Sequence, residues 1–178
     1  MSGGRKGLDR RRFLAGLSAV PMAAAPCGLA LGATSRIEVD GNRLSYQGRP
    51  LRLTGIAVGD PIYIRAERPA SDYETIARDW FANCVRISVM PGHWRRDPVG
   101  TGAALDREIA LARAQSLFVI IDWHAIGFPN YYEPTVPADW GLPPDIQLSS
   151  IADAAGFWRA MARRYFHDPS ILFELWNE

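Results

Sequence analysis

From about residue 37 onward, short apolar runs alternate with stretches whose apolar residues recur at helical spacing. The apolar runs predict strands at residues 51–58, 85–89 and 117–121, and from Ile171 onward. The run at residues 117–121 is continuously apolar, which is typical of a strand buried on both faces. Helices are predicted over about residues 71–83, 103–115 and 150–167. The pattern therefore predicts strand–helix three times, followed by a fourth strand.

Turn and capping patterns mark the ends of several of these elements. Asp40-Gly41-Asn42 lies between two strand-like runs and predicts a hairpin. Ser71 and Glu74 have the spacing of a helix capping box, and so do Ser150 and Asp153. These patterns predict the starts of the first and third helices.

Strands that alternate with helices are expected to be parallel and joined by right-handed crossovers. Both a doubly wound sheet and a (β/α) barrel fit this order. No glycine-rich phosphate loop follows the first strand, which weighs against nucleotide binding. A (β/α) barrel takes about 250 residues, so four strands would make half of one.

The first 33 residues are expected to be an export signal. Arg10-Arg11-Arg12-Phe13-Leu14 opens an apolar, alanine-rich stretch that runs to about Ala33, a layout that looks like a twin-arginine signal. A transmembrane anchor is the alternative, and Pro21 and Pro26 weigh against it. We predict a signal peptide over residues 1–33 and a domain over residues 34–178. The protein would then be periplasmic or extracellular, with no stable membrane span after cleavage.

The charge of the predicted mature chain argues against nucleic acid as a partner. Residues 1–33 hold five of the 20 basic residues and one of the 19 acidic residues, so the remainder is mildly acidic and has no basic patch. Of the two cysteines only Cys84 remains after cleavage, which leaves no intrachain disulfide. Cys84 begins a predicted strand and is expected to be a small buried apolar group.

Polar residues stand within or directly after the predicted strands. Arg86 lies in the second strand, His124 follows the third, and Asn177 and Glu178 follow the fourth. In a (β/α) barrel the carboxyl ends of all strands open on one face, where active sites are built. These four side chains are therefore expected to face one cleft.

Asp122 and His124 could also form a metal pair, because Asp and His one residue apart occur in metal-dependent barrel hydrolases. The sequence offers no His-x-His after the first strand and no further ligands nearby. We expect neither a metal nor another cofactor.

Aromatic residues gather in the loops that follow the second and third strands. Trp94 follows the second strand, and Tyr131 lies in the long connection at residues 125–149; this connection also contains Phe128, Tyr132 and Trp140. Exposed aromatic faces suit the apolar faces of sugar rings. The alternative for each ring is that it packs its loop onto the domain.

Three motifs together resemble glycoside hydrolase family 5, the cellulase-type family. They are Val85-Arg86-Ile87, Ile121-Asp122-Trp123-His124 and Phe173-Glu174-Leu175-Trp176-Asn177-Glu178. The resemblance covers about residues 37–178. It implies an α/β fold, namely a (β/α)8 TIM barrel that is truncated in this chain after the fourth strand.

The resemblance also implies a role for each matching residue. Glu178 would be the general acid/base of a retaining mechanism, and Asn177 would bind the sugar 2-hydroxyl. His124 would line the subsite beside the scissile bond, and Arg86 would hold the catalytic carboxylates ionised. Trp94, Trp123 and Tyr131 are expected to bind substrate. The expected partner is a polysaccharide or oligosaccharide, with β-1,4-glucan leading and mannan, xylan and mixed-linkage glucan left open.

In the family the nucleophilic glutamate ends the seventh strand, which this chain does not contain. Glu174 is about 13 Å from Glu178 along the chain at ~3.3 Å per residue, which is too far for Glu174 to replace the nucleophile. Glu174 could instead form an ion pair with Arg86. We therefore expect this chain alone to be inactive. The alternative is a truncated half barrel with at most glycan binding.

Overall fold

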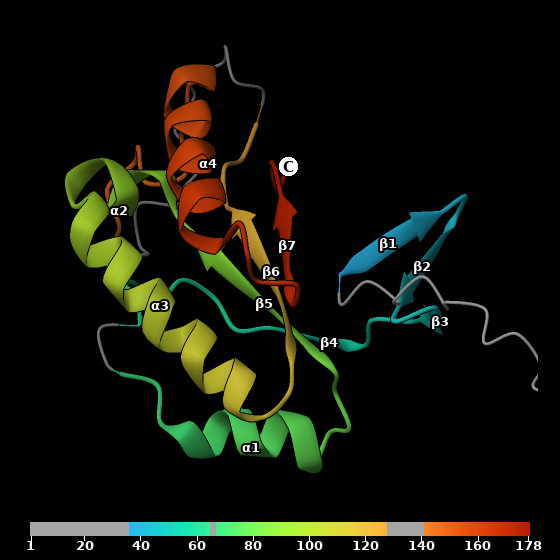
Figure 1. Cartoon of the computed structure of the whole chain (residues 1–178). Coiled ribbons are helices and arrows are strands. Elements are labelled where there is room, and N and C mark those ends of the chain that lie inside the picture. The colour runs from blue at the N-terminus through green and yellow to red at the C-terminus, as the bar shows by residue number, and fades with distance from the viewer. Residues whose placement is uncertain (1–35, 65–66, 128–140) are drawn as a thin grey trace, which may run out of the picture. The chain divides into compact units, whose positions relative to one another are not determined.

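A computed structural model describes residues 36–64, 67–127 and 141–178 (Figure 1). Contacts divide the chain into two units with a boundary between Gly32 and Ala33, and the elements below all belong to the second unit. The predicted signal peptide lies outside the described residues, so it stays a prediction. None of the helices that the structure describes is long and apolar enough to cross a membrane.

The first strands form a small antiparallel sheet, β1-β2-β3. Its strands are β1 (Ile37–Asp40), β2 (Arg43–Tyr46) and β3 (Arg49–Leu51). Asp40 pairs with Arg43 across a turn in which Gly41 adopts φ 59°, a conformation that glycine reaches without strain. The predicted hairpin is confirmed.

Four parallel strands form the second sheet, in the order β4-β5-β6-β7. They are β4 (Gly55–Ala57), β5 (Cys84–Val89), β6 (Phe118–Trp123) and β7 (Ile171–Glu174). Spatial order follows chain order throughout, as in a (β/α) barrel. This arrangement is consistent with a partial α/β barrel.

The predicted strand at residues 51–58 is wrong in its extent, because Leu51 ends β3 in one sheet and Gly55 begins β4 in the other. The Asn83 side chain fixes the segment between them: its Oδ1 accepts from the Thr54 N–H at 2.8 Å, and its Nδ2 donates to the Arg52 carbonyl at 2.8 Å. The two ends of this apolar run therefore belong to different sheets.

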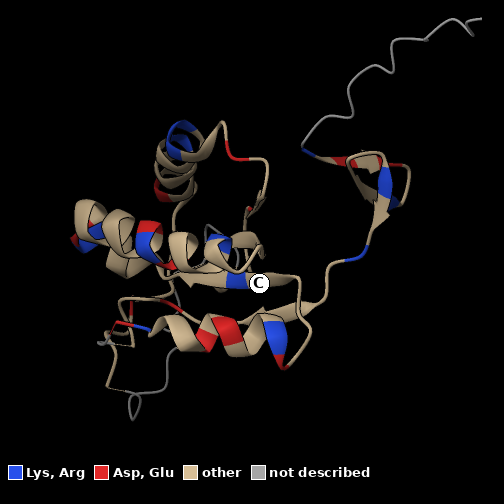
Figure 2. Ribbon diagram, turned by 60° about the horizontal axis from the view of Figure 1, so that its bottom comes forward, with Lys and Arg blue, Asp and Glu red and all other residues tan. Residues whose placement is uncertain are grey.

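Helices α1 (Ala70–Arg78), α3 (Pro98–Ala114) and α4 (Ile151–Tyr165) alternate with the parallel strands, and a short helix, α2 (Pro91–Arg96), follows β5. Figure 1 shows α3 and α4 lying beside these strands. Acidic and basic residues are interspersed along the helices (Figure 2). The core between helices and strands is apolar, and Val85, Ile87, Val119, Ile121 and Phe157 are each 0% exposed.

The two capping boxes had different outcomes. At α4 the Asp153 N–H donates to Ser150 Oγ at 3.0 Å and the Ser150 N–H donates to Asp153 Oδ2 at 3.2 Å, which confirms that prediction. At α1 the helix begins at Ala70, directly after Pro69, so Ser71 lies inside the first turn and caps nothing. The sequence also did not predict α2, and it placed the start of α3 five residues too late.

Candidate active site

Arg86, in the middle of β5, is the centre of a polar cluster at the carboxyl ends of β6 and β7. Its Nε donates to Glu174 Oε2 and its Nη2 to Glu174 Oε1, both at 2.7 Å. Nη2 also donates to Asn177 Oδ1 at 2.7 Å and lies 3.0 Å from Asp122 Oδ2. One guanidinium therefore joins three side chains from two neighbouring strands and the segment that follows β7.

Strand register explains why these groups meet. Asp122 in β6 pairs with Glu174 in β7, so the two carboxylates lie level on adjacent parallel strands. Ser88 pairs with Asp122, which places Arg86 one pleat earlier on the next strand. Alternate residues of a strand share a face, and the long arginine side chain reaches forward to both carboxylates.

The cluster is partly shielded from water, which strengthens its charge pairing. The Arg86 side chain is 24% exposed and that of Asp122 is 0% exposed. The hydrogen bonds from Arg86 hold the pKa of Glu174 below its ordinary value, and the same bonds raise the pKa of Arg86. At neutral pH the structure thus holds Glu174 as a carboxylate against a permanent cation.

His124 joins the same cluster through Asp122. Its Nδ1 lies 2.7 Å from Asp122 Oδ2, and its backbone N–H donates to the Val89 carbonyl at 2.9 Å. The side chain is 23% exposed, so Nδ1 is held by Asp122 while part of the ring remains accessible to solvent.

Backbone hydrogen bonds position Asn177 and Glu178 beside the end of β6. The Asn177 N–H donates to the Trp123 carbonyl and the Glu178 N–H to the Ala125 carbonyl, both at 3.2 Å. Glu178 is exposed, and its charge contributes to the raised pKa of Arg86, after the larger effect of the Glu174 hydrogen bonds. The structure thus brings Arg86, His124 and Asn177 together, with Glu178 within electrostatic reach.

The three aromatic residues that were predicted to bind substrate have different outcomes in the structure. Trp123 was expected to bind substrate, but its ring is 0% exposed, stacks on Phe157 with centroids 4.5 Å apart and donates from Nε1 to Ser149 Oγ at 2.9 Å. This prediction is wrong, because the ring belongs to the core. Trp94 is partly buried and packs edge-on against Phe157, and Tyr131 lies outside the described residues.

A second acidic residue, Asp60, ties together the loops that follow β4 and β5. It is 1% exposed and accepts hydrogen bonds from the Ile62 N–H at 2.7 Å and the Met90 N–H at 2.7 Å, with His93 Nδ1 at 3.0 Å. The sequence alone did not single out Asp60. Its contacts come from two segments about 30 residues apart, which no local pattern reveals.

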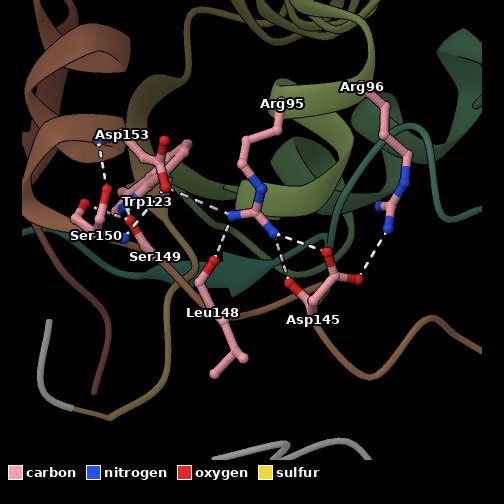
Figure 3. Close-up of polar contacts among 8 residues, drawn as sticks. All are labelled: Arg95, Arg96, Trp123, Asp145, Leu148, Ser149, Ser150 and Asp153. Atoms are coloured by element: carbon pink, nitrogen blue, oxygen red, sulfur yellow. Dashed lines mark hydrogen bonds and ion pairs between the residues drawn. The ribbon is translucent and has the colours of Figure 1, made fainter. Parts of the chain in front are cut away.

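The end of the long connection between β6 and α4 is anchored on α2 (Figure 3). Arg95 donates to the carbonyls of Leu148 and Asp145, and Arg96 donates to Asp145 Oδ1 at 2.9 Å. The Gly92 N–H adds a bond to the Ile146 carbonyl at 2.8 Å. Residues 145–148 are therefore fixed against α2.

The described residues contain no group of three or more His, Cys, Asp or Glu side chains placed to hold a metal ion. Asp122 and His124 are adjacent, but Asp122 Oδ2 is already shared with Arg86.

The parallel sheet and its helices belong to the α/β-barrel class of folds. The Arg86 cluster lies where such barrels carry their functional groups, at the carboxyl ends of the strands. Residues 44–178 match the family model for cellulase (glycosyl hydrolase family 5), and the chain belongs to that family.

Relatives within the family are distant in sequence. The chain is 24% identical over 152 residues to endoglucanase Z of Dickeya dadantii, covering 80% of this chain and 30% of the relative. It is 28% identical over 155 residues to endoglucanase C of Evansella cellulosilytica, covering 83% and 18%. The chain thus spans about a third or less of these relatives.

Solved structures agree on the fold. A β-glucanase from Saccharophagus degradans superposes with a TM-score of 0.69 at 26% identity, covering 81% of this chain and 42% of that one. An endoglucanase catalytic domain from Thermobifida fusca gives a TM-score of 0.62 at 25% identity, covering 80% and 43%. The first has also been solved in complex with cellotetraose, and so has a single-residue variant of the second.

Proposed function

We propose that this chain supplies the acid/base half of the active site of a retaining glycoside hydrolase acting on a β-1,4-linked glucan. The observation that carries the proposal is the Arg86 cluster, in which one guanidinium binds Glu174, Asn177 and Asp122 beside Glu178. The family and the carboxyl-end position of the cluster support the same function.

Each polar residue has a role in this reaction. Glu178 protonates the leaving oxygen and later takes a proton from the incoming water. Asn177, whose Oδ1 accepts from Arg86, keeps its amide N–H groups for a sugar hydroxyl. Arg86 keeps Glu174 ionised and holds Glu174 and Asp122 in place, and His124 offers its exposed part to a sugar ring.

The nucleophile of a retaining mechanism has to lie about 5–5.5 Å from the acid/base carboxyl. The two described acids of the cluster besides Glu178 are both bonded to Arg86, so neither is free to attack a sugar. We propose that the nucleophile comes from outside the described residues and that a polypeptide of residues 1–178 alone does not hydrolyse glycosidic bonds.

The substrate proposal rests on the relatives. Two of the similar structures bind cellotetraose, and the curated relatives are endoglucanases. A β-1,4-glucan is therefore the first substrate to test. Export to the periplasm or beyond the cell would bring the enzyme to such a polymer, and the arginine-rich start of the chain favours that location.

The decisive experiment compares Glu178→Gln with the wild type in the complete protein that carries this segment. Release of reducing ends from a soluble β-1,4-glucan is expected to fall by about 10²–10⁴-fold, the range of general acid–base catalysis. Glu67→Gln is the matched control, because Glu67 is a 79% exposed surface acid that pairs with Arg107 and lies outside the Arg86 cluster. Unchanged activity in Glu178→Gln would overturn the assignment.

Two further measurements test the remaining parts. Retention predicts that the first product released has the anomeric configuration of the substrate, which NMR detects directly. The polypeptide of residues 1–178 is expected to release no more reducing sugar than its own Glu178→Gln variant. Activity above that variant would show that the described acids suffice.

A further inference from the structure

The carboxylate of Asp122 is fully buried and contacts both Arg86 and His124. Its Oδ2 lies 3.0 Å from Arg86 Nη2 and 2.7 Å from His124 Nδ1. Its side chain is 0% exposed, and its Oδ1 has no hydrogen-bond partner in the part of the chain that the structure describes. A single oxygen therefore serves two side chains of the site.

The unpaired Oδ1 bears on why a carboxylate stands here. A buried polar atom without a partner costs about 1–3 kcal/mol, so an amino acid that served packing alone would avoid it. Oδ2, in contrast, has two close partners: the cation of Arg86 at 3.0 Å and the ring nitrogen Nδ1 of His124 at 2.7 Å. The contacts thus favour a role for Asp122 through its partners.

The contact with Asp122 also decides which nitrogen of His124 carries the proton. An ionised carboxylate can only accept hydrogen bonds, so the neutral imidazole must place its proton on Nδ1. The other nitrogen, Nε2, is then an acceptor. Nε2 has no partner within residues 36–64, 67–127 and 141–178, and the ring is 23% exposed.

We propose that Asp122 is a positioning residue: it fixes the Nδ1–H tautomer of His124 so that Nε2 accepts a hydrogen bond from a substrate hydroxyl, while it holds Arg86 against Glu174. The substrate part of this proposal rests on the proposed function; the tautomer part does not. If the proton of His124 were on Nε2, that nitrogen would instead donate to an oxygen of the ligand.

The first test reads the tautomer in the complete wild-type protein. ¹⁵N shifts of the His124 ring, assigned by their loss in His124→Gln, are measured at a pH where the imidazole is neutral. The expected pattern is a protonated Nδ1 and an unprotonated Nε2. A protonated Nε2 overturns the proposal, and this readout comes from the wild-type protein itself.

The second test is Asp122→Asn, whose amide can donate to Nδ1 and so release the proton to Nε2. We expect loss of the Nδ1–H tautomer and a fall in kcat/KM of about 10–100-fold, the range seen when a group that orients a functional side chain is removed. A variant that keeps both the tautomer and kcat/KM within twofold of the wild type overturns the proposal.

Asp106→Asn is the matched control. Asp106 accepts from Tyr165 at 2.7 Å and pairs with Arg164 between α3 and α4, so its loss should lower stability and leave both readouts unchanged. If the wild type hydrolyses no glucan, the proposed function fails. The ¹⁵N measurement still decides whether Asp122 sets the tautomer.

Discussion

Arg86 in β5 and Glu174 in β7 form an ion pair with two hydrogen bonds, in which Nε and Nη2 are each 2.7 Å from a carboxylate oxygen. They are 88 residues apart in the chain. The strand between them, β6, supplies Asp122 to the same guanidinium. The Arg86 cluster therefore forms only when β5, β6 and β7 are all paired in the sheet.

Arg86→Lys is expected to lower the free energy of unfolding by about 1.5–3 kcal/mol, the net worth of hydrogen bonds to charged groups. Lysine carries a point charge without the planar fork, so it cannot bind Glu174 through two nitrogens and reach Asn177 as well. Urea unfolding measures the change. Arg159→Lys, at an exposed arginine of α4 bonded to the Ala155 carbonyl, should stay within about 0.5 kcal/mol of the wild type.

Glu174 should make stability depend on acid pH. Hydrogen bonds from Arg86 lower the pKa of Glu174 in the folded state, so its stabilising effect is complete above the ordinary glutamate pKa of about 4.3 and is lost as the pH falls through the lower folded value. The stability difference between wild type and Glu174→Gln should be large at pH 7 and shrink at pH 3. A difference that grows on acidification would contradict the assignment.

Trp123→Phe should cost about 1–3 kcal/mol of unfolding free energy, because it keeps the ring stacked on Phe157 but leaves Ser149 without its buried donor. Ser149→Ala removes the other partner. Adding the second change to the first should cost less than either change alone, since the bond is already gone. Strictly additive losses in a double-mutant cycle would show that the bond contributes nothing.

Gly55→Ala is expected to disrupt the pairing of β4 with β5. A Cβ on Gly55 would lie 1.9 Å from the Cys84 carbonyl oxygen, a backbone atom that cannot move aside without shifting the strand. Gly156→Ala is the matched control: Gly156 lies in α4 with nothing within 4 Å of the added carbon, and alanine should stabilise that helix by about 0.5–1 kcal/mol. Equal effects of the two changes on thermal unfolding would contradict this account.

The sequence by itself determined the order of strands and helices, the parallel sheet, the hairpin at Gly41 and the cap at Ser150. These features depend on local periodicity and on hydrogen bonds between residues close in the chain. It also placed Arg86 within a strand and His124 and Asn177 directly after strands, and it predicted that they meet, because parallel strands present their carboxyl ends together.

Tertiary structure decided what each of these side chains contacts. Trp123 follows the alternation of a strand just as a cleft residue would, and only the approach of Phe157 and Ser149 from distant segments buries it. The register that sets Asp122 beside Glu174 is likewise a property of paired strands. Local pattern cannot specify such contacts, because they join segments whose separation in the chain carries no information about their distance in space.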